Sequence, residues 1–148
     1  MENKNSFRLS FPSHSANEAF ARVAVSAFVT QTDPTVEELC DIKTAVSEAV
    51  TNCIVHGYRD TIGTVYIQGS ISRDNIITIK VKDKGCGIED VDKAREPLYT
   101  TAGDERAGLG FAVMESFMDK VNVKSKMGKG TVVTMKKRIS VRARYADN

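Results

Sequence analysis

The sequence predicts one α/β (α+β) domain, a two-layer sandwich in which helices cover one face of a mixed, mostly antiparallel β-sheet. Two patterns and the chain length support this prediction. Apolar residues recur at three- and four-residue steps between residues 17 and 57 and again after residue 108, whereas they alternate with polar residues around 65–81 and 121–135. A chain of 148 residues is enough for one domain with a sizeable core and too short for two ordinary domains.

The first third of the chain is expected to form a strand and two helices. The strand lies at 7–11 and the first helix at 17–30. This helix carries an apolar stripe, which consists of Ala16, Phe20, Val23, Ala24, Ala27 and Phe28. After Pro34, the pair Thr35 and Glu38 has the spacing of a capping box and opens a longer helix that ends near Gly57.

The remainder of the chain alternates between strands and helices. In order, strands are expected at 65–71 and 77–81, a short helix at 90–95, a helix at 108–118, and strands at 121–123 and 131–135. Asp74 and Asn75 suit a hairpin turn between the first two of these strands. The loop from about Lys84 to Ala107 is longer than an ordinary connection and indicates a mobile cover over a phosphate-bearing ligand.

The composition places the chain in the cytoplasm, without a membrane partner. No apolar run approaches the roughly 18 residues that a membrane-spanning helix needs. The N-terminal residues lack the apolar core of a secretory signal. The three cysteines form no C-x-x-C pair, which argues against both a disulfide framework and a zinc site. Cys40 and Cys53 fall in an apolar helical pattern and are interpreted as core residues.

The charge is unevenly distributed along the chain. Residues 1–137 are expected to form the domain, and residues 138–148 a basic tail that is partly disordered. A basic tail can contact nucleic acid, but a solvated terminus is the simpler interpretation. The rest of the chain has no basic helix and no stripe of aromatic residues, so no direct nucleic-acid partner is expected.

Three motifs indicate a nucleotide site. In the long helix, Glu48 and Asn52 are four residues apart and share a face. The amide oxygen of Asn52 is a ligand type suited to magnesium, and Glu48 can accept a proton from an attacking hydroxyl. An ordinary polar helix face remains the alternative for this pair.

The second motif is Asp83-Lys84-Gly85-Cys86-Gly87, directly after a strand. An aspartate there can accept a hydrogen bond from an exocyclic amine such as that of adenine. Gly85 and Gly87 let the backbone pass close to a flat ring. A plain turning loop is the alternative.

The third motif is Gly108-Leu109-Gly110, just before a helix, where exposed backbone N–H groups favour phosphate. It fits neither a P-loop nor the dinucleotide fingerprint. Thr131 opens the last strand, where its hydroxyl can hold a base or a water, although threonine is also a good strand former.

Together, the order and spacing of these motifs resemble the N, G1 and G2 boxes of the GHKL superfamily of ATPases and kinases. The resemblance runs from about Phe7 to Met135 and implies the Bergerat ATP-binding fold. The absence of a transducer or phosphoacceptor domain favours the branch of free-standing serine kinases that act as anti-sigma factors. Further segments resemble the sporulation members of that branch: Phe11-Pro12, Asn17-Glu18-x3-Ala21-Arg22, Glu48 to Tyr58, and Glu96 to Thr101.

The resemblance implies ATP or ADP as the nucleotide, with Mg²⁺ held by Asn52 and Glu48 as the base that acts on a serine hydroxyl. The implied nucleotide-contacting residues are Asn52, Asp83, Gly85, Gly87, Thr100, Thr101, Gly108, Leu109, Gly110 and Thr131. Asp83 would bind the adenine amine, and Thr100 and Thr101 would lie in the lid. Arg106 is a candidate for the γ-phosphate charge and His56 for the rim of the site; for both, an ordinary polar role remains the alternative.

The resemblance also implies protein partners. These are a sporulation sigma factor (sigma F), which is held away from RNA polymerase, an anti-anti-sigma factor of the STAS type as the phosphoacceptor, and a second copy in a homodimer. Arg22, on the first helix, would anchor a partner, or is simply a surface arginine. Three rival functions remain open: a serine kinase of the sporulation or general-stress type that sequesters a sigma factor, a binding-only switch gated by ATP, and a detached histidine-kinase-like module.

Overall fold

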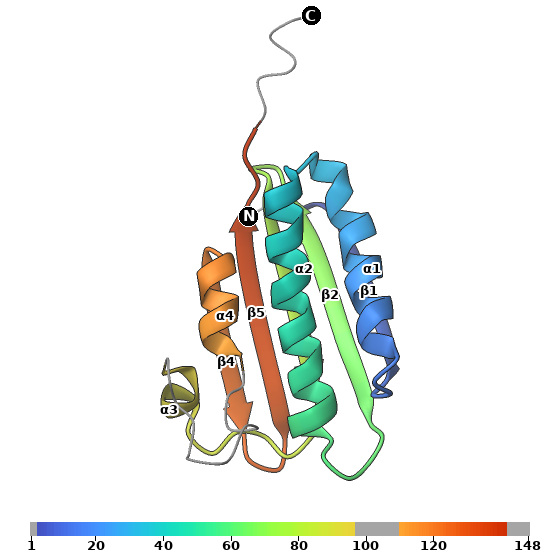
Figure 1. Cartoon of the computed structure of the whole chain (residues 1–148), viewed down its shortest axis with the longest axis vertical. Coiled ribbons are helices and arrows are strands. Elements are labelled where there is room, and N and C mark those ends of the chain that lie inside the picture. The colour runs from blue at the N-terminus through green and yellow to red at the C-terminus, as the bar shows by residue number, and fades with distance from the viewer. Residues whose placement is uncertain (1–2, 97–109, 142–148) are drawn as a thin grey trace, which may run out of the picture.

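A five-stranded sheet with the order β1-β2-β3-β5-β4 forms one layer of the computed structural model, which describes residues 3–96 and 110–141. The strands are β1 Asn3–Pro12, β2 Thr64–Ser72, β3 Ile76–Asp83, β4 Lys120–Lys126 and β5 Gly130–Arg138. The helices are α1 Asn17–Val29, η1 Thr30–Thr32, α2 Val36–Thr51, η2 Asn52–Gly57, α3 Val91–Arg95 and α4 Phe111–Phe117. The helices α1, α2 and α4 lie side by side over one face of the sheet (Figure 1), which confirms the two-layer sandwich.

Within the described ranges, all four strand pairings are antiparallel, so the expected parallel component of the sheet is not found. Two hairpins account for much of this. Asn75, between β2 and β3, adopts a left-handed conformation with φ 65°, and Gly128, between β4 and β5, has φ 77°. Every strand is also longer than the apolar pattern predicted, because pairing with a neighbour extends a strand into polar sequence.

Helix α2 begins as the sequence predicted. The hydroxyl of Thr35 accepts a hydrogen bond from the backbone N–H of Glu38 (3.0 Å), and the Glu38 carboxylate accepts one from the N–H of Thr35 (2.8 Å). The other carboxylate oxygen of Glu38 accepts a bond from the N–H of Ser140 (3.0 Å). The capping box therefore also ties the start of α2 to the chain that leaves β5.

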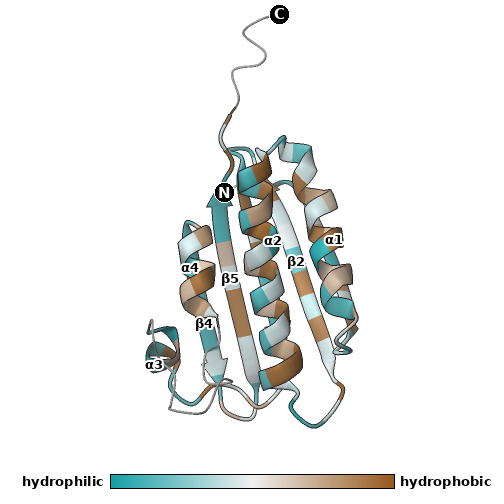
Figure 2. Ribbon diagram, viewed as in Figure 1, coloured by the Kyte–Doolittle hydropathy of each residue, from teal (hydrophilic) through white to brown (hydrophobic). Residues whose placement is uncertain are grey.

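Helix α2 packs its apolar stripe on the sheet, and brown apolar residues alternate with polar ones along it in Figure 2. Its fully buried residues are Ile42, Ala45, Val46, Ala49 and Val50. Cys53, in η2, is buried as predicted, but Cys40 is exposed. The prediction for Cys40 was wrong because it lies one position beyond Leu39, outside the arc that faces the sheet.

The apolar stripe predicted for α1 was largely wrong, although Phe28 of that stripe packs partly buried against the core. The buried residues are Ala21, Val25 and Val29, whereas Phe20 is 52% exposed and Val23 is 65% exposed. Helix α1 carries apolar residues around most of its circumference, so periodicity alone does not choose the face. Contact with α2 makes the choice, while Phe28 and Phe20 of the predicted stripe contact Phe7 and Phe11 of β1.

The boundaries of two predicted helices differ in the structure. The long helix stops being an α-helix at Thr51 and continues as a π-helix, η2, from Asn52 to Gly57. The predicted helix at 108–118 is an α-helix over Phe111–Phe117, and residues 108 and 109 lie outside the described ranges. The short helix predicted at 90–95 is confirmed as α3, with Asp90 as its N-cap.

The chain beyond β5 begins inside the core. Ile139 is 1% exposed, and its N–H donates a hydrogen bond to the carbonyl of Asn75 (2.9 Å). Residues 142–148 of the predicted basic tail lie outside the described part of the chain. Among the residues that the structure describes, no helix is long and apolar enough to span a membrane.

We expect Thr35→Ala to lower the free energy of unfolding by about 1 kcal/mol, because it removes the N-cap acceptor of α2. Urea denaturation measures the change. Thr44→Ala is the matched control, since the Thr44 hydroxyl bonds only to the Cys40 carbonyl of its own helix. Equal stabilities of the two variants would contradict a stabilising role for the capping box.

Candidate functional site

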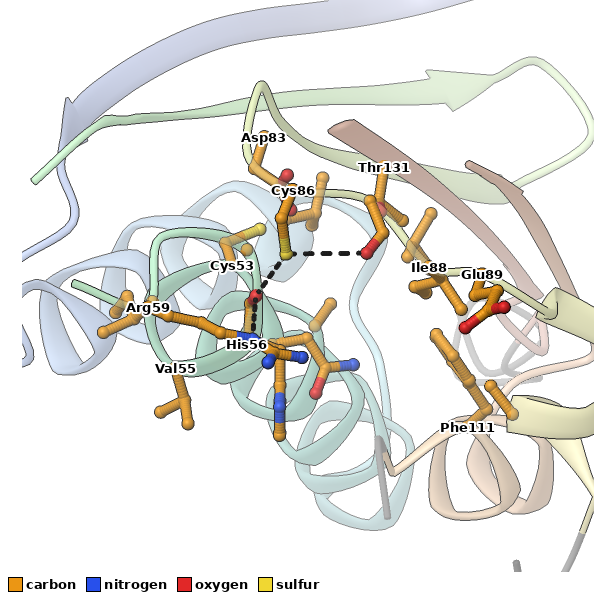
Figure 3. Close-up of a pocket in the computed structure, with 18 of the residues that line it drawn as sticks. Cys53, Val55, His56, Arg59, Asp83, Cys86, Ile88, Glu89, Phe111 and Thr131 are labelled. Carbon is orange, nitrogen blue, oxygen red and sulfur yellow. Dashed lines mark hydrogen bonds between the residues drawn. The ribbon is translucent and has the colours of Figure 1, made fainter. Parts of the chain in front are cut away.

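A cleft of about 1390 Å³ opens between η2, the end of β3, the start of β5 and α3. It is lined by four of the residues that the sequence predicted to bind a nucleotide, namely Asn52, Asp83, Gly87 and Thr131. His56 lines it as well. Figure 3 shows Asp83, Cys86, His56, Thr131 and Phe111 around the same space. The fold therefore brings together residues that are up to 79 positions apart, from Asn52 to Thr131.

Asp83 is the buried polar group of this cleft. It continues the inward-facing row of β3 after Ile79 and Val81, and it is only 4% exposed. Burial raises the pKa of its carboxyl, which hydrogen bonds from the N–H of Gly85 (2.9 Å) and from the thiol of Cys53 partly offset. The carboxylate therefore has partners within the protein and lies at the wall of the cleft.

Glycines make room for this carboxylate. A Cβ on Gly57 would lie 2.8 Å from the Cγ atom of Asp83, so any larger residue at 57 would displace the carboxylate. The N–H of Cys86 bonds to the carbonyl of Gly57 (3.0 Å), and a Cβ on Gly85 would collide with that carbonyl. Gly87 has φ 80° and packs on the backbone of Lys126. The predicted need for glycines is met here by close backbone packing, and Gly85 itself lies behind the cleft wall.

Tyr58 fixes the chain that leaves β3. Its hydroxyl accepts a hydrogen bond from the N–H of Lys84 (2.7 Å) and donates one to the carbonyl of Thr64 (2.6 Å). The side chain is 7% exposed. This single hydroxyl links the end of β3 to the start of β2, next to Asp83.

The π-helix η2 presents Asn52 and His56 to the cleft. A π-turn widens the helix by one residue per turn and is common at functional sites. The carbonyl of His56 accepts a hydrogen bond from the thiol of Cys86 (3.1 Å), seen as a dashed line in Figure 3. This bond holds η2 against the glycine loop and makes Cys86 part of the wall.

Thr131 is held in place from the neighbouring strand. Its hydroxyl and that of Ser125 are 2.8 Å apart, and the Ser125 hydroxyl also accepts a bond from the N–H of Ile88 (2.8 Å). Ser125 therefore joins β4, β5 and the segment after Gly87 at the mouth of the cleft.

Glu48 lies beside the cleft and is not one of its lining residues. It packs against Gly110, which begins α4 with φ 70° and whose missing Cβ leaves room for the carboxylate. Burial, and then the negative charge of Glu18 on α1, raise the pKa of Glu48. Glu18 in turn accepts a hydrogen bond from the hydroxyl of Ser47 (2.7 Å).

Arg22, predicted as an exposed partner anchor, is paired within α1. One of its guanidinium nitrogens lies 3.6 Å from the carboxylate of Glu18, and 39% of the side chain is exposed. The arginine is thus half-buried and close to the surroundings of Glu48. Thr100, Thr101, Arg106, Gly108 and Leu109 lie outside the described residues.

Sequence reasoning missed four residues of the site: Cys53, Gly57, Tyr58 and Ser125. The sequence predicted Cys53 only as a core residue, because it lies on the apolar stripe of the helix. Its hydrogen bond to the Asp83 carboxylate depends on the tertiary structure. Gly57 and Tyr58 end the segment from Glu48 to Tyr58 that carries the resemblance, and this was the one signal in the sequence that could have marked them as site residues.

Comparison with known proteins assigns the chain to a family. A model of the histidine kinase-like ATPase domain matches residues 11–137. An anti-sigma F factor of Thermoanaerobacter sp. (strain X514) is 58% identical over 94% of this chain and 97% of its own length. One from Clostridium perfringens (strain SM101 / Type A) is 56% identical over 92% of this chain and 98% of its own.

Solved structures share the fold. The RsbU and RsbW domains of a Mycobacterium tuberculosis protein align with a TM-score of 0.68 at 17% identity, over 92% of this chain and 32% of that longer chain. The histidine kinase domain of a blue-light activated kinase from Erythrobacter litoralis aligns with a TM-score of 0.57 at 21% identity, over 82% of this chain and 60% of that chain. The chain belongs to the histidine kinase-like ATPase family of the GHKL superfamily and, within it, to the anti-sigma F factors.

Proposed function

We propose that this protein binds ATP or ADP in the cleft, holds a sporulation sigma factor away from RNA polymerase, and phosphorylates a serine of an anti-anti-sigma factor. The buried carboxylate of Asp83 at the cleft wall is the observation that carries the proposal. A buried carboxylate is costly unless it has partners, and one that also faces an open cleft is placed to accept a bond from a ligand.

The described residues fit an adenine nucleotide. Asp83 would accept a hydrogen bond from the exocyclic amine, with Thr131 and the backbone of Gly87 beside the ring. The apolar side chains of Ile88 and Val133 line the cleft, where they would pack against the faces of the adenine ring. Gly110 lies next to Glu48, where the phosphates of a nucleotide seated on Asp83 would extend.

Magnesium fits through Asn52. Within residues 3–96 and 110–141, no group of three His, Cys, Asp or Glu side chains is placed to hold a metal ion by itself, so a bound ion would need further ligands. Mg²⁺ commonly keeps several waters and binds through one or two protein oxygens together with nucleotide phosphates. The amide oxygen of Asn52 on the cleft wall suits that role.

Glu48 is the proposed base for phosphoryl transfer. Bound Mg-ATP supplies the γ-phosphoryl group. The serine hydroxyl of the STAS-type partner forms the new O–P bond, the bond from the γ-phosphorus to ADP breaks, and the hydroxyl proton passes to Glu48. The raised pKa of Glu48 favours this acceptance, because a more basic carboxylate takes a proton more readily.

Sigma-factor binding is proposed from the family. The relatives named above are called anti-sigma F factors, which implies sigma F as the partner here. Arg22 remains the proposed anchor, with its guanidinium oriented by Glu18. A homodimer and a cytoplasmic location belong to the same proposal.

A binding-only switch is the second candidate, because Glu48 is not among the residues that line the cleft. In that case, nucleotide binding alone would set the affinity for the sigma factor. The variants below separate the two functions.

We expect Asp83→Asn to weaken ADP binding by about 10- to 100-fold, because it removes a charged acceptor for the adenine amine. Isothermal titration calorimetry measures the affinity. Asp74→Asn is the matched control, since Asp74 is an exposed aspartate between β2 and β3 and is not among the residues that line the cleft. An unchanged affinity in Asp83→Asn would refute the adenine contact.

Glu48→Gln should lower phosphoryl transfer to the anti-anti-sigma factor by about 10²- to 10⁴-fold, while ADP affinity stays within a few fold. Mass spectrometry of the partner measures acid-stable phosphoserine. Glu37→Gln, at the exposed start of α2, is the control. Undiminished transfer in Glu48→Gln would remove the base assignment, and acid-labile phosphate on the partner would indicate a histidine kinase.

The rate of transfer should fall as the pH falls through the raised pKa of Glu48, because the base must be deprotonated. Glu18→Gln removes the nearby negative charge, so the midpoint of the pH–rate profile should move to lower pH. Glutamine can still accept the Ser47 hydrogen bond, although it no longer pairs with the Arg22 guanidinium, whose positive charge then also lowers the pKa of Glu48. A profile that does not move would show that the charge of Glu18 does not act on the base.

A further inference from the structure

The second face of the sheet, which α1, α2 and α4 leave uncovered, is basic. Strand register places one set of exposed cations on it, and we refer to this set as the basic sheet face. Its members are Arg8, Lys80, Lys82, Lys84, Lys120, Lys124, Lys126, Lys136 and Arg138. The eight members that lie in strands alternate with residues that point toward the helices, as Lys80 and Lys82 do with Ile79 and Val81. Lys84 directly follows β3, and its ammonium lies over the ring of Tyr66, an outward residue of β2.

The basic sheet face carries no carboxylate of its own. The outward positions of the five strands are otherwise hydroxyl, amide or apolar residues, and none is Asp or Glu. The ion pairs of the described residues, such as Lys137 with Asp41, lie on the helix side, and none involves a member of this face. The carboxylate of Asp119, the residue before β4, accepts a hydrogen bond from the backbone N–H of Arg138.

The charge is concentrated there at the expense of the rest of the chain. The sequence has 21 Lys and Arg and 19 Asp and Glu, with a net charge of +2. With nine cations on one face, the remainder of the chain has a net charge of −7. The modest net charge of the whole chain therefore conceals a basic face and an acidic remainder.

Where β4 pairs with β5, this arrangement opposes stability. Lys120 and Lys136 are directly opposite each other on β4 and β5, and like charges in that position repel. The ammonium of Lys84 lies 5.1 Å from the ring centroid of Tyr66, which leaves the cation on the surface. Since the repulsion costs stability, we infer that the cations are kept for binding. A surface of many cations binds a polyanion best.

The neighbouring side chains indicate which polyanion. Between the cations lie hydroxyl and amide residues: Ser10, Gln68, Ser70, Thr78, Asn122 and Thr134. Lys, Arg, Ser, Thr, Asn and Gln are the side chains that contact phosphate oxygens of nucleic acids. Protein interfaces are depleted of Lys and Ser, and membrane-binding surfaces insert large apolar residues, which this face lacks apart from Tyr66, Ile76 and Val132.

We propose that the basic sheet face binds the phosphodiester backbone of duplex nucleic acid without reading its sequence. The face has no protruding helix to enter a groove and no aromatic stripe on which unpaired bases would stack. The binding surface lies on the opposite side of the sheet from the nucleotide cleft. The sequence predicted no nucleic-acid partner because strand alternation separates these cations along the chain, and only the register of β3, β4 and β5 brings them together.

The test is fluorescence anisotropy of the full chain with a short labelled DNA duplex, titrated at salt concentrations from about 50 to 200 mM. The affinity should fall linearly on logarithmic axes as salt rises. Lys80→Gln should weaken binding to duplexes of different sequence alike and reduce the salt slope by about 1, and Lys80→Gln/Lys136→Gln by about 2. Lys43→Gln, on α2, is the matched control and should leave the slope unchanged.

Thermal melting verifies that the variants remain folded, and Lys136→Gln should melt no lower than the wild type because it relieves the repulsion from Lys120. Parallel titrations use a single-stranded DNA, anionic phospholipid vesicles and polyglutamate. The proposal is overturned by an absence of salt-dependent duplex binding, by an unchanged slope in Lys80→Gln/Lys136→Gln, or by equal weakening in Lys43→Gln. Preference for the single strand, the vesicles or the peptide would also overturn it.

Discussion

Burial of the Asp83 carboxylate is the constraint on which the site depends. The group stands in a row of core side chains, where an unpartnered charge would destabilise the fold. The N–H of Gly85, the thiol of Cys53 and the space left at Gly57 make this burial tolerable. The same partners fix the carboxylate at the wall of the cleft, where it faces the proposed nucleotide.

Helix α2 transmits this constraint to the rest of the molecule. At its start, the Glu38 carboxylate joins the capping box to Ser140 after β5. Near its end, Glu48 lies beside Gly110, and the π-helix that follows presents Asn52 and His56 to the cleft. A single helix therefore positions the proposed metal ligand, the proposed base and the wall behind Asp83.

The two faces of the sheet divide the proposed functions. Helices cover one face of the sheet (Figure 1), and the cleft opens on that side, while the exposed cations of the basic sheet face lie on the other. Side chains alternate between the two faces along each strand. Inward residues can therefore be selected for packing in the core, and outward residues for binding at the surface. Val81 completes the core, and its neighbours Lys80 and Lys82 belong to the outer surface.

The sequence by itself determined the elements, the capping box of Thr35 and the order of the three motifs, because these depend on residues close together in the chain. It did not determine which side of α1 is buried, that Cys53 supports Asp83, or that separate lysines share one surface. Those features depend on contacts between distant segments. Apolar periodicity shows that a residue can be buried, whereas only tertiary packing and strand register decide what it meets there.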